Sequence, residues 1–231
     1  MRLDHVTRRT ALCAPAALAL PGCWKPLFTW RQKLTLEVEA GGEVYTGSSV
    51  IKVFWKEAYG ASMTGRPNAS WMRGEAAFVD IPGKETLFAL LKSPHDKGDP
   101  RRAAFWALGF APEPGFDVES FRALSRAQGR KATLAPDQYP MLVTFDDIAD
   151  PKSVREVDPQ NLSGSFSGGV RLKRILLEIT DEPVTELIET KLNWLSRYHA
   201  NNYRLNGKSC VACPVASENL PDMMGPGNFK I

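Results

Sequence analysis

The chain has 231 residues, of which 43% are hydrophobic and 24% are charged, so it can bury a substantial core and is not a disordered protein. Its 29 basic and 26 acidic residues leave a net charge of +3. Arg171, Lys173 and Arg174 form only a small cluster, which is typical of a solvated strand face. No basic stripe with interleaved aromatic residues appears in the sequence, and this excludes nucleic acid as an expected partner.

Residues 1–23 have the pattern of an export leader. Three arginines precede an apolar run at 11–20, which is too short to span a bilayer and is typical of a signal peptide. Arg8 and Arg9 lie in a segment that resembles a twin-arginine motif, although alanine stands where phenylalanine is usual. Export by the general secretory route and by the twin-arginine route therefore both remain open.

The leader ends in Leu-Pro-Gly-Cys, which resembles the bacterial lipobox except for Pro21. We expect Cys23 to be lipidated, with palmitate or a similar acyl chain, so that the protein is anchored at the periplasmic face of a bacterial membrane, in the cell envelope. The alternatives are an ordinary signal peptide, or a buried N-terminal segment in which Cys13 and Cys23 are small apolar residues. Residues 24–29 then form a short linker, and the body lies close to the membrane.

The clearest structural pattern of the sequence begins directly after this linker. From 30 to 40 the even positions are mostly apolar and the odd positions polar, which predicts a half-buried strand. Gly41 and Gly42 predict a two-residue turn, since glycine accepts a positive φ. Ala40 then faces Glu43, and the numbers of every opposed pair add up to 83. The returning strand continues to Lys56 with its apolar residues on the same face.

Small residues interrupt the inward face of the returning strand. Gly47 and Ser49 lie there, and we expect them to admit a large neighbour such as Trp71. A second hairpin is predicted from strands at 71–81 and 85–92, joined by Pro-Gly-Lys. Four strands would then form one antiparallel sheet.

Three helices and two further strands complete the predicted body. Asp99 and Pro100 begin a helix at 101–108, and Asp117 begins a second one that Gly129 ends; both should cover the sheet. A third helix begins at Pro183, with its packed side formed by Leu187, Ile188, Lys191, Leu192 and Leu195. Strands are expected at 139–145 and at 170–180, the latter with a bulge near Lys173 and Arg174 because its inward parity changes there.

Acidic residues cluster between these elements, at Asp146, Asp147, Asp150 and Asp158. They lack the glycine and the spaced oxygen ligands of a calcium loop, so caps and turns are the interpretation we favour. Neither a phosphate-binding loop nor a nucleophile elbow is present. Among the histidines that would survive removal of the leader, only His95 and His199 could serve a catalytic triad. We assign no catalytic residue, no cofactor and no metal ligand.

Residues 200–231 lack periodicity and predict a flexible tail that the fold does not require. The tail holds the pair Cys210 and Cys213, one CxxC without a second pair and without the histidine of a haem attachment site. A disulfide and two idle thiols are the favoured states. A copper site that adds Met223 or Met224 is a third.

Several short runs in the second half of the chain resemble a pattern of uncharacterised proteobacterial proteins, many with lipoprotein-type leaders. The runs are DP at 150–151, VDP at 157–159, Leu162, GVRL at 169–172, ITDEPVT at 179–185, IE at 188–189 and WL at 194–195, and Gly47 to Val50 is similar too. The resemblance covers much of the mature body with gaps. It implies no activity, so no functional residue is carried over.

The sequence therefore predicts a single α+β domain at 30–199, a mainly antiparallel sheet covered by about three helices, with a mobile C-terminal tail. We expect an exported, lipid-anchored cell-envelope protein with a non-catalytic binding or structural role. Its partners would be the membrane and an unknown protein or small ligand. One alternative is a periplasmic enzyme, which a deep polar pocket at His95 or His199 would favour. The other is a metal or redox protein that uses Cys210 and Cys213.

Overall fold

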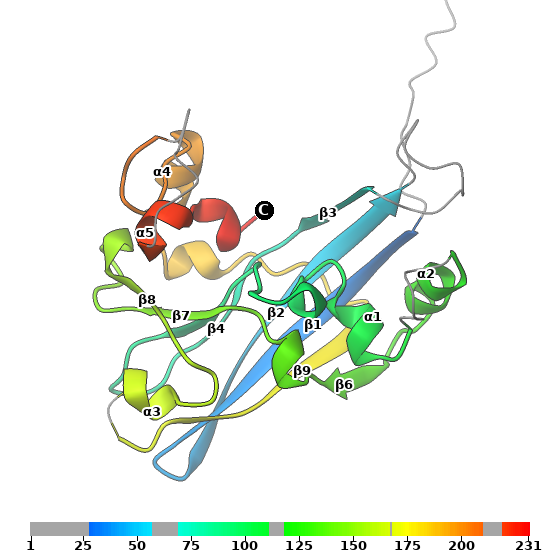
Figure 1. Cartoon of the computed structure of the whole chain (residues 1–231), viewed down its shortest axis with the longest axis horizontal. Coiled ribbons are helices and arrows are strands. Elements are labelled where there is room, and N and C mark those ends of the chain that lie inside the picture. The colour runs from blue at the N-terminus through cyan, green and yellow to red at the C-terminus, as the bar shows by residue number, and fades with distance from the viewer. Residues whose placement is uncertain (1–27, 57–68, 111–117, 167, 210–218) are drawn as a thin grey trace, which may run out of the picture.

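The protein is described here by a computed structural model, which covers residues 28–56, 69–110, 118–166, 168–209 and 219–231. It is a mixed α+β fold, as predicted, and its described strands form two antiparallel sheets (Figure 1). The first sheet has the order β3 (Ala69–Arg73), β2 (Glu43–Lys56), β1 (Phe28–Ala40), β9 (Arg171–Thr180) and β6 (Lys131–Thr133). The second has the order β4 (Ala77–Val79), β5 (Leu87–Ala89), β7 (Leu142–Phe145) and β8 (Val154–Glu156).

The predicted first hairpin is confirmed in its register. Ala40 lies opposite Glu43 and Trp30 opposite Val53, so all opposed pairs of β1 and β2 follow the expected rule. Gly41 and Gly42 have φ values of 61° and 85°. Both angles lie in the left-handed region that a two-residue turn of a twisted hairpin requires. Local turn chemistry and the apolar period thus specify this element without help from the rest of the chain.

The predicted bulge in β9 is also confirmed. Glu37 of β1 lies opposite Arg174, whereas the next residue of β1 lies opposite Leu172, so Lys173 is the extra residue. Arg174 donates two hydrogen bonds of 2.8 Å to Glu37, and Lys173 lies 3.6 Å from the same carboxylate. The hydrogen bonds from Arg174 are the main reason why the pKa of Glu37 is lowered. The small basic cluster is therefore paired with acids of β1 and is not simply solvated.

The second predicted hairpin is correct only in its turn and in the pairing close to it. β4 pairs with β5, and the Lys84 N–H donates to the Ile81 carbonyl across the turn. The expected strand at 71–81 is divided at Gly74, whose φ is 140°. The part before this glycine is β3 of the first sheet, and the part after it is β4 of the second. One continuous four-stranded sheet was therefore the wrong expectation, because the chain leaves the first sheet here.

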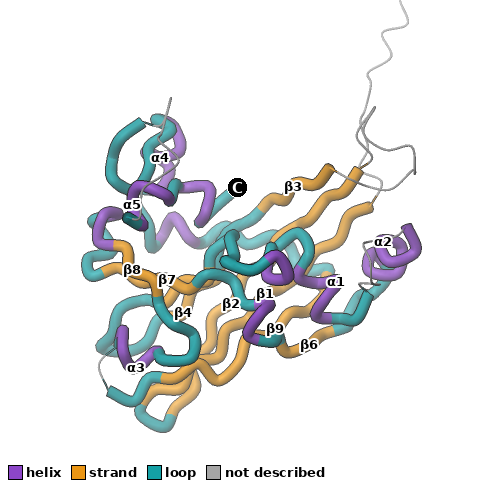
Figure 2. Tube along the Cα trace, in the orientation of Figure 1, coloured by secondary structure: helices purple, strands orange, loops and turns teal. Residues whose placement is uncertain are grey.

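The second sheet is buried on both faces, which accounts for the uninterrupted burial of β5 and β7. One set of alternate residues packs toward the first sheet, namely Ala77, Val79, Leu87, Ala89 and Leu142. The other set packs toward the C-terminal segments, namely Phe88, Val143 and Phe145 together with Trp194, Leu195 and Phe229. The molecule consequently has two apolar cores with the second sheet between them. Figure 2 shows β4, β7 and β8 of that sheet between the first sheet and the helices α4 and α5.

The described residues form five short α-helices, more than the three expected: α1 (Ala103–Ala107), α2 (Val118–Ser125), α3 (Leu162–Ser165), α4 (Leu195–Ala200) and α5 (Leu220–Met223). The expected cover of the first sheet by two helices is confirmed. Phe105 of α1 meets the Trp30 ring edge-on at 5.4 Å between ring centroids. Phe121 of α2 stacks on Phe28 at 5.5 Å.

The helix expected from Pro183 is replaced by a 3₁₀ turn at Ile188–Thr190 and by α4. Thr185 explains the difference, because its N–H donates to the Val50 carbonyl at 3.1 Å and its hydroxyl accepts from the Val50 N–H at 2.9 Å. These bonds hold the segment extended beside β2, so a helix cannot begin at the proline.

The expectation of a mobile tail from residue 200 is wrong for the described residues 219–231. Met224 and Phe229 are fully buried, and Phe229 contacts the rings of Phe88 and Trp194. Ile231 exchanges two backbone hydrogen bonds of 2.9 Å with Gly74. The end of the chain is thus a part of the second core, and the same holds for Leu205, which is also fully buried.

We predict that Gly47→Ala is strongly destabilising. Gly47 of β2 passes directly beneath the backbone of β4, and a Cβ added there would lie 1.7 Å from the Phe78 carbonyl oxygen. Because backbone cannot move aside as a flexible side chain can, the cost should be about 3 kcal/mol or more of unfolding free energy. Gly227→Ala is the matched control, since nothing lies within 4 Å of its added Cβ. Equal denaturant midpoints for the two variants would contradict this close crossing of the β2 and β4 backbones.

Phe229→Ala should cost about 3–5 kcal/mol of unfolding free energy, because a fully buried ring would be replaced by a cavity. Ile231, two residues later, is 52% exposed. Its replacement by alanine should change the unfolding free energy by no more than about 0.5 kcal/mol. Urea unfolding of both variants measures the difference. Similar unfolding midpoints for the two variants would show that the fold does not require the C-terminal residues.

Candidate functional site

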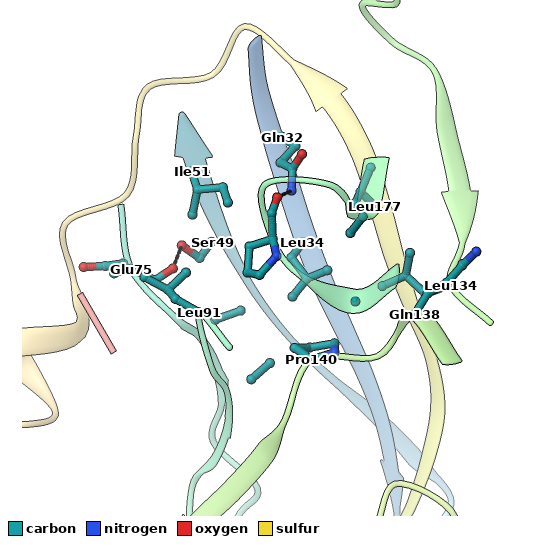
Figure 3. Close-up of a pocket in the computed structure, with 15 residues that line it drawn as sticks. Gln32, Leu34, Ser49, Ile51, Glu75, Leu91, Leu134, Gln138, Pro140 and Leu177 are labelled. Carbon is teal, nitrogen blue, oxygen red and sulfur yellow. Dashed lines mark hydrogen bonds between the residues drawn. The ribbon is translucent and has the colours of Figure 1, made fainter. Parts of the chain in front are cut away.

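Within the described residues, polar groups gather around several hollows. The first is an enclosed cavity of about 30 Å³ between the two sheets, close to α1 (Figure 3). Its walls are mostly apolar. Leu34 and Leu177 come from the first sheet, and Leu91 comes from the segment directly after β5 of the second sheet. Gln32, Ser49, Glu75 and Gln138 are the polar side chains among its lining residues.

The polar side chains around this cavity are bonded to the protein. Gln32 accepts from the Trp30 indole N–H at 2.9 Å and donates to the Pro100 carbonyl at 2.8 Å, and Ser49 donates to the Glu75 carbonyl at 2.7 Å. A cavity of this volume holds about one water molecule, whereas pockets for small ligands measure about 300–1,000 Å³. The cavity is therefore a structural part of the core.

Glu75 is the most unusual of these residues, because its carboxylate is buried at 1% exposure and has an apolar surrounding. Its two oxygens accept the backbone N–H groups of Leu187 and Ile188, at 2.6 and 3.1 Å. The backbone of Glu75 itself pairs with that of Lys230 in an isolated antiparallel β-bridge. Glu75 thus joins the junction of the two sheets to the start of the C-terminal segments, and its described contacts are structural.

The second hollow is an open cleft of about 560 Å³ next to His95. Residues from three segments, at 94–95, 136–142 and 156–160, form it, and they include the ends of β7 and β8. The polar residues of the wall are His95, Asp137, Tyr139, Glu156, Asp158 and Gln160. Four prolines, Pro94, Pro136, Pro140 and Pro159, line it as well. Prolines have a fixed φ, so this wall is stiff. The volume suits a small ligand or a few residues of a peptide.

Two carboxylates of this cleft already have partners. Lys97 donates to Asp137 at 2.8 Å, and this hydrogen bond lowers the pKa of Asp137. Asp158 accepts the N–H of Gln160 at 2.8 Å. Burial raises the pKa of the Tyr139 hydroxyl. No serine, threonine, cysteine or lysine is among the described residues that line the cleft. Its polar side chains offer hydrogen bonding and negative charge, and the described wall has no aliphatic hydroxyl, thiol or amine nucleophile.

The third hollow, of about 360 Å³, lies beside His199 and is lined by Asn202, Tyr203 and Arg204 from one segment and by residues 225–228 from another. The two histidines that the sequence singled out therefore line different clefts, and the structure does not bring them together.

The acidic residues between β7 and α3 act as caps and turns, as predicted. Asp150 accepts the N–H of Lys152, and Asp147 accepts that of Ala149. Asp146 is paired with Arg155. Within the described ranges, no three residues of the types His, Cys, Asp and Glu are grouped as ligands of a metal ion.

The cysteines lie outside the described residues, both Cys13 and Cys23 in the leader and the pair Cys210 and Cys213. The two methionines considered as copper ligands differ in exposure. Met224 is fully buried in the second core, whereas Met223 is 41% exposed. Of these two methionines, only Met223 is therefore exposed to solvent.

One group of residues was missed in the sequence. On the outward face of the first sheet, Arg31 lies opposite Lys52, and Lys52 lies opposite Arg73. Phe54 and Trp71 form the next row and stack at 5.0 Å with an interplanar angle of 3°. The hairpin register already implied the first pair, since 31 and 52 add up to 83. The place of β3 in the row could not be inferred, because β3 follows a long connection.

No family model, no curated protein and no solved structure matches this chain. Among the described residues, no helix has the length and apolar character needed to cross a membrane.

We predict that Glu75→Ala lowers the unfolding free energy by about 2–4 kcal/mol, because two buried N–H groups would lose their acceptor. Glu186→Ala is the matched control in the same region. Its carboxylate pairs with Arg73 at 2.9 Å, but both side chains are more than half exposed, so its loss should cost no more than about 0.5 kcal/mol. Chemical denaturation of the two variants would refute a structural role for Glu75 if their midpoints agreed.

Proposed function

We propose that this protein is an exported cell-envelope protein, anchored at the periplasmic face of a bacterial membrane by a lipid on Cys23, with a non-catalytic binding or structural role. The observation that carries the proposal is the leader, in which basic residues and a short apolar run precede Leu-Pro-Gly-Cys. The resemblance to proteobacterial proteins with lipoprotein-type leaders supports it.

The position of the first strand agrees with this proposal. β1 begins at Phe28, five residues after Cys23. A stretch of five residues spans at most about 18 Å. A lipid on Cys23 would therefore keep this end of the first sheet close to the bilayer surface, and the cleft at His95 would remain available for a protein segment or a small ligand.

An enzymatic role has weaker support. The cleft at His95 places a histidine among carboxylates, which is a precondition for acid–base chemistry. Two of these carboxylates already accept hydrogen bonds, and no serine, threonine, cysteine or lysine is among the described residues of the wall. A metal or redox role for Cys210 and Cys213 rests on the sequence motif alone. The binding role therefore remains the proposed function.

We predict that a palmitate analogue fed to cells labels the wild-type protein and not Cys23→Ala. The Cys13→Ala variant, which changes the other cysteine of the leader, is the control and should keep its label. Fractionation should show wild type and Cys13→Ala in the membrane fraction and Cys23→Ala depleted from it. Equal labelling of all three proteins, or no labelling of wild type, would refute the lipid anchor.

A further inference from the structure

We propose that the outward face of the first sheet is a binding surface for anionic phospholipid, formed by Arg31, Lys52, Phe54, Trp71 and Arg73. We call it the basic–aromatic surface. The inference deepens the proposed function, because it names the bilayer itself as a partner of the folded body in addition to the acyl chain.

The first observation is a row of like charges. Arg73, Lys52 and Arg31 lie directly opposite one another on β3, β2 and β1. Like charges in opposed positions on neighbouring strands destabilise a sheet. Such a local conflict without compensation in the fold is expected at functional sites, and an anionic partner would remove the repulsion.

The described protein does little to neutralise this row. Arg31 has no ion pair and no side-chain hydrogen bond within the described ranges. Arg73 is paired with Glu186, but the two side chains are 69% and 58% exposed, so the pair contributes little. The Nζ of Lys52 lies 5.0 Å from the centroid of the Phe54 ring, which leaves its charge uncancelled. At the far end of the same sheet the basic side chains Lys173 and Arg174 are paired with Glu37, whose side chain is only 11% exposed. Nearer to Phe28, Lys33 is paired with Glu182, and Arg31 and Lys52 have no such ion pair within the described ranges.

The second observation is the aromatic row beside the charges. Phe54 and Trp71 stack face to face, and Trp71 is 39% exposed although it is the bulkiest side chain of β3. The Nζ of Lys56 lies 5.5 Å from the Trp71 ring centroid. Tryptophan with flanking basic residues is typical of the region where a bilayer meets water, since the ring enters the interface and the cations remain among the headgroups.

The third observation is the direction in which these rows lie. Thr29 is opposite Phe54, and Arg31 is opposite Lys52. The aromatic row is therefore two residues nearer to the start of β1 than the charged row, and the start of β1 is the end that a lipid on Cys23 would hold at the bilayer. The order of lipid, aromatic row and cationic row along the chain matches the order of acyl chains, interface and headgroup charge. A bilayer thus explains the arrangement better than a soluble anion does.

The test uses the full chain with Cys23→Ala, which cannot carry the lipid, so that its outcome is independent of lipidation. Sedimentation is measured with vesicles of phosphatidylglycerol and phosphatidylcholine, and with vesicles of phosphatidylcholine alone. We expect stronger binding to the anionic vesicles and a decline with added salt. Absence of lipid labelling at Cys23 together with such binding would refute the proposed anchor but leave this inference intact.

Three further variants locate the surface. Lys52→Glu and Trp71→Ala should each lower the partition coefficient for anionic vesicles, the former by about tenfold or more. Lys152→Glu makes the same charge change at an exposed position in the turn between β7 and β8 of the second sheet and should leave the coefficient within about twofold. All variants share residues 1–27, so any affinity of the apolar leader is common to them. Equal binding of Lys52→Glu and Lys152→Glu would overturn the proposal.

A loss of folding cannot imitate the expected result. Lys52→Glu replaces two repulsive cross-strand pairs by attractive ones, so its thermal midpoint should not fall below that of the parent chain. A variant that is as stable as the parent and binds less identifies a surface effect. Binding of soluble polyphosphate that depends on Lys52, without binding to either kind of vesicle, would show that the surface takes a soluble polyanion and would refute a lipid surface.

Discussion

The close crossing of two backbones at Gly47 is the constraint on which the rest of the structure depends. β4 can lie against β2 only because Gly47 has no Cβ, since that atom would overlap the Phe78 carbonyl. The crossing brings the second sheet onto the first, and the residues on its two faces then enter two different cores. Beside the crossing, Ser49 donates to the Glu75 carbonyl, which satisfies a polar group that the approach of the sheets would otherwise bury unpaired.

Glu75 extends the same junction to the C-terminal part. Its buried carboxylate accepts two N–H groups at the start of the 3₁₀ turn, while the N–H of the neighbouring Ala76 donates to the Phe229 carbonyl. Burial of an unpaired carboxylate is costly. The fold therefore requires the C-terminal segments to lie where their N–H groups can pair with Glu75. A stretch of chain that is polar and rich in turns is thereby fixed against the second sheet.

The two faces of the first sheet illustrate how stability and function separate. The inward face has apolar side chains under α1 and α2, and its register follows the rules of an amphipathic hairpin. The outward face combines a paired end at Glu37 with an end at Arg31 and Lys52 where like charges are opposed. The first end is explained by folding alone. The opposed like charges of the second end do not stabilise the fold. This contrast is the physical basis for assigning a ligand to that end.

The sequence by itself determined what depends on neighbours along the chain: the register of β1 and β2, the bulge at Lys173 and the caps at Asp150 and Asp158. Each follows from a local period, a glycine turn or a short-range hydrogen bond. Only the tertiary structure decided that the chain changes sheets at Gly74, that Phe229 is buried and that Arg73 completes a row with Lys52. These outcomes depend on contacts between residues far apart in the chain, and such contacts leave no period in the sequence. The cleft at His95 belongs to the same group, because its walls come from segments about 40 and 60 residues apart, whereas the pair Arg31 and Lys52 could be derived from the hairpin rule.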